Sequence, residues 1–261
     1  MKKVKRLVAN FTKYRFLLVE LVKKDIKLKY RSSVLGFLWT MLEPLLTMIV
    51  LTLVFENMFE RKIPNFPVYV LCGRLLYSYF SNGTKLALKS IRRNSSMIRK
   101  VYVPKYMYPL ASALSGYITF LISLIVLVVV GIVQDVKPTW YIFQAIFPLA
   151  TILVMTIGLG FILATLDVFF RDMEYLWSVL LMLIMYMSAI FYDPSKLLAT
   201  PKGILIRLNP LYGIITNFRN AIFGEPMNMT YFAYTAGLSV VVLIVGVFMF
   251  YRQQDKFVLY V

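Results

Sequence analysis

The chain has 261 residues, of which 60% are hydrophobic and 16% charged, against about 25% charged residues in a typical soluble domain. That much apolar surface exceeds what a soluble core can bury, so the composition excludes an ordinary soluble protein and indicates an all-α membrane protein. The formal net charge of +17 fits the basic cytoplasmic side of such a protein, whereas nucleic-acid binding would require a soluble basic face.

The residue inventory excludes several kinds of site. Cys72 is the single cysteine and histidine is absent, so the chain has no internal disulfide, no Cys-based zinc cluster and no His-based triad. It contains no G-x-x-x-x-G-K-S/T phosphate loop, the motif that cradles the phosphates of ATP. We find no convincing pair of carboxylates and no nucleophile with a base. The sequence therefore predicts no catalytic residue, no metal ligand and no enzyme activity.

Residues 11–30 are expected to form an amphipathic helix directly before the first membrane span. At 100° per residue, its apolar side chains fall within one half-circle and most of its charged side chains within the other. The apolar face consists of Phe11, Tyr14, Leu17, Leu18, Leu21, Val22, Ile26 and Leu28. Such a helix lies in the headgroup plane with its apolar side toward the lipid; the alternative is an ordinary juxtamembrane anchor.

Six apolar segments are read as membrane-spanning helices, most of them with the roughly 20 residues that a bilayer core requires. They lie near 33–55, 67–88, 107–133, 141–166, 175–192 and 231–251, within a single transmembrane domain of residues 1–261. The second is weaker because Arg74 and Lys85 sit near its ends, and the fifth is short and rich in methionine.

Lysine and arginine set the predicted orientation. They dominate the segment before the first span and the loop between the second and third spans, whereas the next loops on the other face carry mixed charges. The positive-inside rule therefore places both termini in the cytoplasm. The last external segment, 193–229, is long, partly apolar and contains several prolines, which predicts short external re-entrant or surface helices between spans five and six.

Glu43 is the clearest acid within a predicted span, and Pro44 follows it. A charge at mid-bilayer costs about 3 kcal/mol or more, so this carboxylate should face protein or water, or be protonated. The proline frees a backbone carbonyl one turn earlier. Glu43 is either a polar contact between packed helices or a residue that lines a passage.

Four stretches of the sequence give more specific information about the kind of membrane protein than the composition does. They are KKDIKLKYRSSVLGFLWTMLEPLL at 23–46, NSSMIRKVYVPKYMYPLA at 94–111, DVFFRDMEYL at 167–176 and LNPLYGIITNFRNAIFG at 208–224. Together, and in this order, the chain resembles the membrane subunits of type-2 ABC exporters that move polysaccharides and teichoic acids. The departures are modest: Arg74 and Tyr77 stand where that family often has an apolar residue and tryptophan.

The resemblance implies a half-transporter. Two copies of a six-helix subunit would form a homodimer, and two separate ABC ATPase chains would dock below it and bind ATP and Mg²⁺, so this chain needs no cofactor of its own. The implied ATPase-coupling residues are Arg92, Arg93, Met97, Ile98, Arg99, Lys100, Tyr102, Arg171, Asp172 and Glu174. The alternatives are plain positive-inside charge for the loop 89–106 and a helix boundary with a local ion pair for the turn 171–174.

On this interpretation, cations of the interfacial helix meet the phosphates of a lipid-linked substrate and the first and fifth spans line a channel. The substrate-admitting residues are Lys23, Lys24, Lys27 and Arg31, and the channel-lining residues are Phe37, Trp39, Glu43, Tyr186, Phe191 and Tyr192. Aromatic rings offer flat apolar surface to the C–H faces of sugars. Each aromatic residue could instead belong to the interfacial belt or face lipid.

The implied function is the transmembrane subunit of an ATP-driven exporter in the bacterial cytoplasmic membrane. It would move a lipid-linked polysaccharide such as O antigen, capsule or a teichoic-acid-like polymer. A drug or small-lipid exporter of the same superfamily is the alternative, although the polysaccharide-type stretches disfavour it. An ion-coupled carrier would carry more ionisable residues at mid-membrane, and a membrane-embedded glycan enzyme would need paired carboxylates or histidines. Membrane lipids are expected partners and nucleic acid is not.

Overall fold

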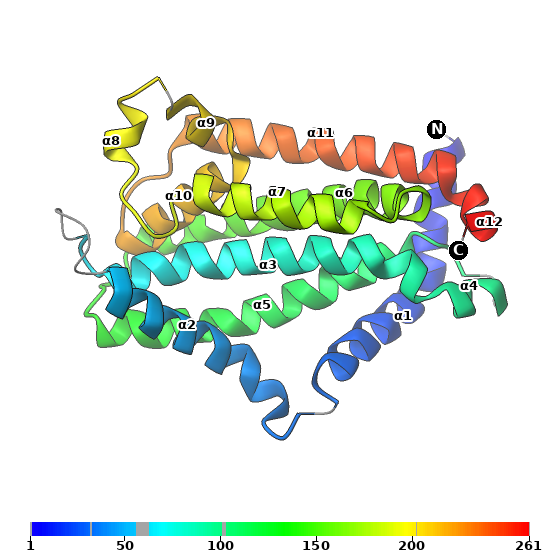
Figure 1. Cartoon of the computed structure of the whole chain (residues 1–261), viewed down its shortest axis with the longest axis horizontal. Coiled ribbons are helices and arrows are strands. Elements are labelled where there is room, and N and C mark those ends of the chain that lie inside the picture. The colour runs from blue at the N-terminus through cyan, green and yellow to red at the C-terminus, as the bar shows by residue number, and fades with distance from the viewer. Residues whose placement is uncertain (1, 32, 56–62, 101–102, 202, 261) are drawn as a thin grey trace.

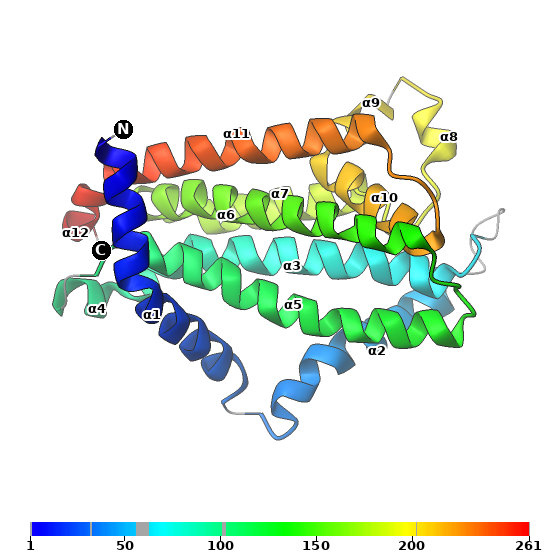
Figure 2. The ribbon, with the colours of Figure 1, turned by 180° about the vertical axis from the view of Figure 1, so that it is seen from behind.

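The computed structural model describes residues 2–31, 33–55, 63–100, 103–201 and 203–260, with side chains from Tyr14 onward apart from 258 and 259. Every regular element within these ranges is a helix. Figures 1 and 2 show a bundle of long helices, and the N- and C-termini of the chain lie at the same end of this bundle. The predicted all-α class is therefore confirmed.

The long helices follow the six predicted segments. They are α2 (Trp39–Phe55), α3 (Phe66–Arg93), α5 (Met107–Val133), α6 (Ile146–Phe169), α7 (Met173–Met187) and α11 (Met229–Gln253). Short 3-10 helices, η1 (Gly36–Leu38) and η2 (Trp140–Ala145), precede α2 and α6. The end that carries both termini also carries α4 (Ser95–Lys100), η3 (Gln254–Lys256) and α12 (Phe257–Tyr260) (Figure 1).

Length and composition alone identify four of these segments as able to cross a membrane. Among the described residues they are Gly36–Phe55, Met107–Val133, Trp140–Phe169 and Met229–Lys256. The helix α7 is apolar but has only 15 residues, and α3 has 28 residues but carries a polar face. Nevertheless α3 packs against α2, α5, α6, α7 and α10, so it occupies the middle of the bundle.

The fifth long helix ends before its predicted boundary at residue 192. It stops at Met187, and Ala189 adopts a left-handed φ of 47°, a conformation that cannot continue a right-handed helix. The carbonyl groups of Ala189 and Ile190 accept hydrogen bonds from Arg219 instead. Phe191 and Tyr192 therefore lie in the non-helical segment that follows α7.

The N-terminal helix α1 (Lys2–Tyr30) is longer than the predicted amphipathic helix and ends where predicted. Its first part runs across the end of the bundle, and its second part runs obliquely to an elbow with α2 (Figures 1 and 2). Leu18, Leu21 and Val22 are buried in a core shared with α5, α6 and α11. The expectation that the apolar face points to lipid is thus wrong for its centre, which packs on protein; Phe11 lies outside the described side chains.

Small residues allow α6 to lie close to its neighbours. A Cβ atom on Gly158 would come within 2.7 Å of the Leu243 backbone of α11, and one on Gly160 within 2.8 Å of the Ala87 Cβ of α3. Helices associate in membranes through such close backbone approach, because lipid removes most of the hydrophobic driving force. These contacts hold α6 between α3 and α11.

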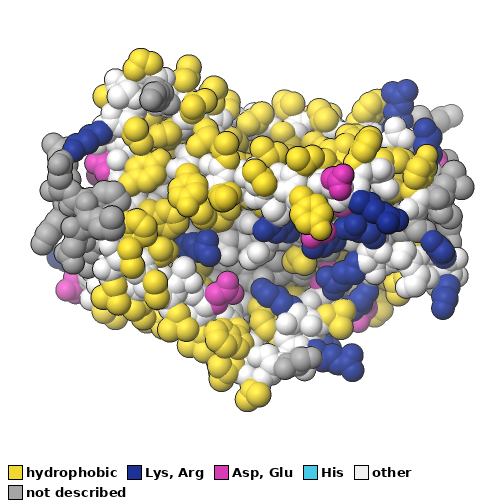
Figure 3. Space-filling model, viewed as in Figure 1, with side chains coloured by type: hydrophobic (Ala, Val, Ile, Leu, Met, Phe, Trp, Pro, Cys, Tyr) yellow, Lys and Arg dark blue, Asp and Glu magenta, His cyan; other side chains and the backbone are white. Residues whose placement is uncertain are grey.

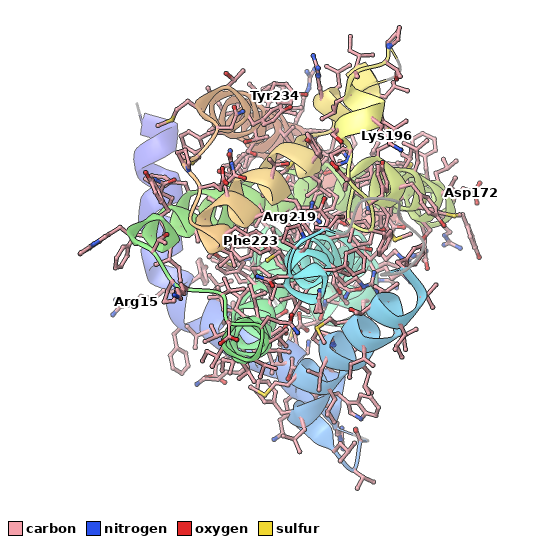
Figure 4. The ribbon with its side chains drawn as sticks, turned by 90° about the vertical axis from the view of Figure 1, so that its left-hand side faces the viewer. Arg15, Asp172, Lys196, Arg219, Phe223 and Tyr234 are labelled. Atoms are coloured by element: carbon pink, nitrogen blue, oxygen red, sulfur yellow. The ribbon has the colours of Figure 1, made fainter. Side chains whose placement is uncertain are left out.

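The segment 193–229 contains the predicted short helices. They are α8 (Ser195–Leu198), α9 (Gly203–Leu208) and α10 (Pro210–Phe223), at the bundle end opposite the termini (Figure 1). The Asn209 side chain caps α10 by accepting a hydrogen bond from the Leu211 N–H at 3.1 Å, as expected for an N-cap asparagine. Most of α10 is buried, and its Arg219 lies beside α3 (Figure 4).

Candidate functional site

A cavity of about 650 Å³, lined by charged and polar as well as apolar side chains, lies between α1, α2, α3 and α5. Its wall is formed by the last residues of α1, the first half of α2 and one face each of α3 and α5. Figure 3 shows basic and acidic side chains interrupting the largely apolar surface on this side of the molecule. We call this feature the polar cavity.

The helix α3 gives the cavity its positive charge. Arg74, Ser78, Asn82 and Lys85 line it, and spacings of four, four and three residues keep them on one side of the helix. The ion pairs formed among the described residues include neither Arg74 nor Lys85. Because of this polar face, the mean hydropathy of α3 is too low for a typical membrane span, although the helix lies in the middle of the bundle.

The wall formed by α2 contains Glu43 and Pro44. Because proline has no N–H, the Thr40 carbonyl one turn earlier lacks its usual helix partner. Ser123 Oγ of α5 donates a hydrogen bond to this carbonyl at 3.0 Å, which satisfies it and ties α2 to α5. The exposed carboxylate of Glu43 lines the cavity and joins no ion pair among the described residues.

The wall formed by α1 is fastened to α3 and α5 through Asp25. One carboxylate oxygen of Asp25 lies 3.5 Å from an Arg93 nitrogen, and the other accepts a hydrogen bond from Ser112 Oγ at 3.1 Å. The neighbouring Lys24 donates to Asn94 Oδ1 at 2.9 Å, directly before α4. These contacts join the end of α1 to the segment that carries α4.

An ion-pair cluster joins the two segments that were predicted to meet an ATPase. Arg92 of α3 lies 3.1 Å from Glu174 and 3.2 Å from Asp167, and Lys89 also pairs with Glu174. The Asp167 carboxylate is 1% exposed and accepts no aligned hydrogen bond among the described residues, so Arg92 balances it mainly by charge. The cluster fixes the start of α7 against the last turns of α3.

The remaining predicted coupling residues lie at the same end of the bundle. In α4, Met97 is exposed, Ile98 packs against the core below α1, and Arg99 and Lys100 are exposed. Arg171 and Asp172 occupy the exposed turn between α6 and α7. Tyr102 lies outside the described residues.

Lys105 lies between α4 and α5 and connects this part of the chain to the C-terminal segment. Its ammonium group donates to the Gln254 carbonyl at 2.6 Å. Burial lowers the pKa of Lys105 from its ordinary value, and the nearby Asp255 carboxylate opposes that shift. The start of α5 is therefore held against the end of α11.

The four predicted substrate-admitting cations do not form one cluster. Lys23 pairs with Glu20 on its own helix at 2.9 Å, Lys24 contacts Asn94, and Lys27 and Arg31 are exposed. None of the four lines the polar cavity. The cation of α1 that does line it is Lys29.

The predicted channel-lining residues separate into two groups within one chain. Phe37 of η1 and Trp39, the first residue of α2, are exposed at the elbow and lie near Glu43 in sequence. Phe191 stacks on Phe55 at the other end of α2, with ring centroids 5.7 Å apart, and Tyr192 donates a hydrogen bond to the Tyr186 carbonyl at 2.8 Å. A single copy of the chain therefore does not bring them around one channel.

Sequence reasoning missed Lys29, Arg74 and Lys85 as members of a common site. The signal was present in α3, where Arg74 and Lys85 share a face with Ser78 and Asn82, but it was read only as a weakened span. The contribution of α1 could not be read from periodicity, because it depends on the angle at the elbow. Among the described residues, no three Cys, Asp or Glu side chains are grouped to hold a metal ion.

Comparisons with known proteins agree with the resemblance. The chain matches the model of the family described as ABC-2 type transporter over residues 17–223. It is similar to the O-antigen export system permease protein RfbA of Myxococcus xanthus, with 33% identity covering 84% of this chain and 85% of that protein. RfbA of Klebsiella pneumoniae is 29% identical, covering 92% and 93%, and the polysialic acid transport protein KpsM of Escherichia coli is 22% identical, covering 89% and 91%.

Proposed function

The chain belongs to the ABC-2 type transporter family of membrane proteins, and from this premise we propose that it is the permease subunit of an ATP-driven exporter. Its cargo is a lipid-linked polysaccharide that crosses the bacterial cytoplasmic membrane. The relatives named for O-antigen export, and the one named for polysialic acid transport, match this chain over most of its length. O antigen and polysialic-acid-type polysaccharides are therefore the favoured cargo classes. Capsule and teichoic-acid-like polymers are included in the proposal.

The observation that carries the proposal is the polar face of α3 in the middle of an otherwise apolar bundle. Arg74 and Lys85 stand on this face without an acidic partner among the described residues. Charged groups at membrane depth mark water-filled cavities and substrate paths far more often than lipid-facing surface. A polar polymer requires such a wet surface.

We further propose six membrane crossings by α2, α3, α5, α6, α7 and α11, with both termini in the cytoplasm. The positive-inside rule favours this orientation, because the end with α4 and both termini gathers many of the Lys and Arg side chains in Figure 3. The helices α8, α9 and α10 are then external and re-entrant or superficial.

The transporter is proposed to be a homodimer with two ABC ATPase chains, which bind ATP and Mg²⁺. We propose that α7 contributes to the contact between the two copies. Its outer face carries the apolar residues Leu176, Val179 and Leu183, which are more than half exposed in a single copy. The ATPase would dock on α4 and on the turn at Arg171, which the ion-pair cluster connects to α3. The two groups of predicted channel-lining residues would then meet across two copies.

Reconstitution tests this function directly. The chain is purified with a candidate ABC ATPase partner and placed in vesicles that contain a lipid-linked polysaccharide. We expect movement of the polymer that requires ATP and stops when the phosphate-loop lysine of the ATPase is replaced. Polymer movement by this chain without nucleotide would overturn the proposal, and ATP-dependent movement of small lipids alone would favour the drug or small-lipid exporter.

A further inference from the structure

The polar cavity carries more positive charge than its own acids neutralise. Lys29, Arg74 and Lys85 line it, and the described residues place no carboxylate within 4.0 Å of any of these cations. Glu43 is the unpaired acid on the wall. Three cations against one carboxylate leave a surplus of positive charge.

The fourth cation and the second acid of the cavity do not change this balance. Arg93 lies 3.5 Å from Asp25, so these two neutralise each other at the cytoplasmic end. The surplus therefore lies on Lys29 at the end of α1 and on Lys85 and Arg74, farther along α3.

The depth of the two cations on α3 makes the surplus costly. Arg74 and Lys85 each lie about two turns or more from the nearer end of α3, a helix whose 28 residues extend about 42 Å. The hydrocarbon core is about 30 Å thick, so both charges fall within it if α3 crosses the membrane. An unpaired charge there costs about 3 kcal/mol or more, which water and an anion entering the cavity would offset.

We propose that the polar cavity binds the phosphate or diphosphate group of a lipid-linked substrate, with Lys29, Arg74 and Lys85 as the groups that hold it. This rests on the proposed function. Phosphate oxygens accept strong charge-assisted hydrogen bonds from Arg and Lys. Ser78 and Asn82 lie between the two cations of α3 and add neutral donors to the same face.

The spacing of Arg74 and Lys85 on α3 defines two successive positions for a phosphate headgroup. Arg74 and Lys85 are about 16 Å apart along the helix axis, which is longer than a diphosphate group. One headgroup therefore contacts Lys85 first, near the cytoplasmic end, and Arg74 later.

A binding experiment with the full-length chain tests the subsite without transport. The chain is placed in phosphatidylcholine nanodiscs, and binding of radiolabelled geranylgeranyl diphosphate is measured at equilibrium. We expect the double variant Arg74→Gln, Lys85→Gln to weaken binding about tenfold or more, the effect of losing the charge-assisted contact at both positions. Each single variant should remove one of the two positions and lower the amount of ligand bound at saturation. Glu43→Gln should tighten binding because it removes a repulsive carboxylate from the wall.

The matched control is Lys137→Gln, which removes an exposed cation outside the cavity and should leave binding unchanged. Competition identifies the source of the anion: displacement by inorganic diphosphate assigns the site to the phosphate group alone, and displacement only by prenylated phosphates assigns it to a lipid headgroup. Either result supports the subsite. Equal affinity of wild type and the double variant Arg74→Gln, Lys85→Gln overturns it, as does equally tight binding of geranylgeraniol.

The opposite sign expected for Glu43→Gln keeps the test decisive if a cation variant fails to fold. The outcome also separates this inference from the proposed function. Export of polysaccharide with unaltered headgroup binding in the double variant would remove the subsite and leave the exporter. Headgroup binding that depends on Arg74 and Lys85, in a chain that exports no polysaccharide with its ATPase, would support the subsite and overturn the proposed exporter function.

Discussion

The guanidinium of Arg219 lies over the ring of Tyr69, with its central carbon 3.4 Å from the ring centroid. Its nitrogens donate to the carbonyls of Tyr69 at 3.2 Å, Ala189 at 3.0 Å and Ile190 at 3.1 Å. The close approach requires Gly73, because a Cβ atom there would stand 2.9 Å from an Arg219 nitrogen. One buried side chain thus joins α10, the start of α3 and the turn after α7.

We expect Arg219→Lys to destabilise the protein strongly. An ammonium group cannot reach three carbonyls on two segments, and each buried acceptor left unpaired costs about 1–3 kcal/mol. Thermal unfolding of the detergent-solubilised protein measures the effect. Arg207→Lys is the control, because Arg207 is exposed and donates to the single carbonyl of Leu198; equal losses in the two variants would contradict the assigned role of Arg219.

The pair of Arg92 with buried Asp167 predicts an asymmetric set of variants. Arg92→Gln should destabilise the protein by about 2 kcal/mol, because it leaves a buried carboxylate without its nearest cation. Asp167→Asn should be milder, and combined with Arg92→Gln it should recover most of the loss. Thermal unfolding of the two single variants and the double variant gives the coupling; additive losses would show that the pair does not interact.

The exposed end of α4 predicts a charge-dependent contact with the ATPase. Changing Arg99 and Lys100 to Glu should weaken association by about tenfold or more, because like charges would then face the proposed docking surface of the ATPase. Co-purification and equilibrium binding measure it. The same charge change at Arg252 and Lys256, which are exposed at the same end, is the control, and an equal loss there would point to net charge alone.

Two glycines of α11 provide a packing test within one helix. A Cβ atom on Gly246 would meet the Gly158 carbonyl oxygen of α6, whereas one on Gly237 would meet nothing within 4 Å. Gly246→Ala should destabilise the bundle by about 1–3 kcal/mol through overpacking. Gly237→Ala should be neutral or slightly stabilising. Unfolding by heat in detergent compares them, and equal stability would mean that α6 and α11 separate without cost.

The exposed aromatic residues predict effects on transport without effects on assembly. Trp39→Ala and Tyr186→Ala should each reduce polymer export in the reconstituted complex, because a sliding polysaccharide loses flat apolar surface. Both side chains are exposed, as is Phe248 on α11, so Phe248→Ala is a control of matched chemistry. Export that is equally reduced by all three would assign Trp39 and Tyr186 to the lipid-facing surface.

The amino-acid sequence by itself determined the all-α class of the protein and the approximate positions of its long helices. Apolar runs of bilayer length need no tertiary information, because each helix satisfies its own backbone hydrogen bonds. The third span, predicted at 107–133, matches α5 at Met107–Val133. Four stretches together indicated the family, and one of them, LNPLYGIITNFRNAIFG, contains Asn209 and Arg219, which provide the cap and the buried contact of α10.

Only the tertiary structure decided which charges meet. The end of α7 depends on Arg219, which lies 30 residues after Ala189, and no local pattern encodes that contact. The polar cavity depends on the elbow between α1 and α2, which brings Lys29 to the same cavity as Arg74 and Lys85. A sequence shows only which charged residues are present. The free energy of a charge within a membrane depends on the groups that surround it in space.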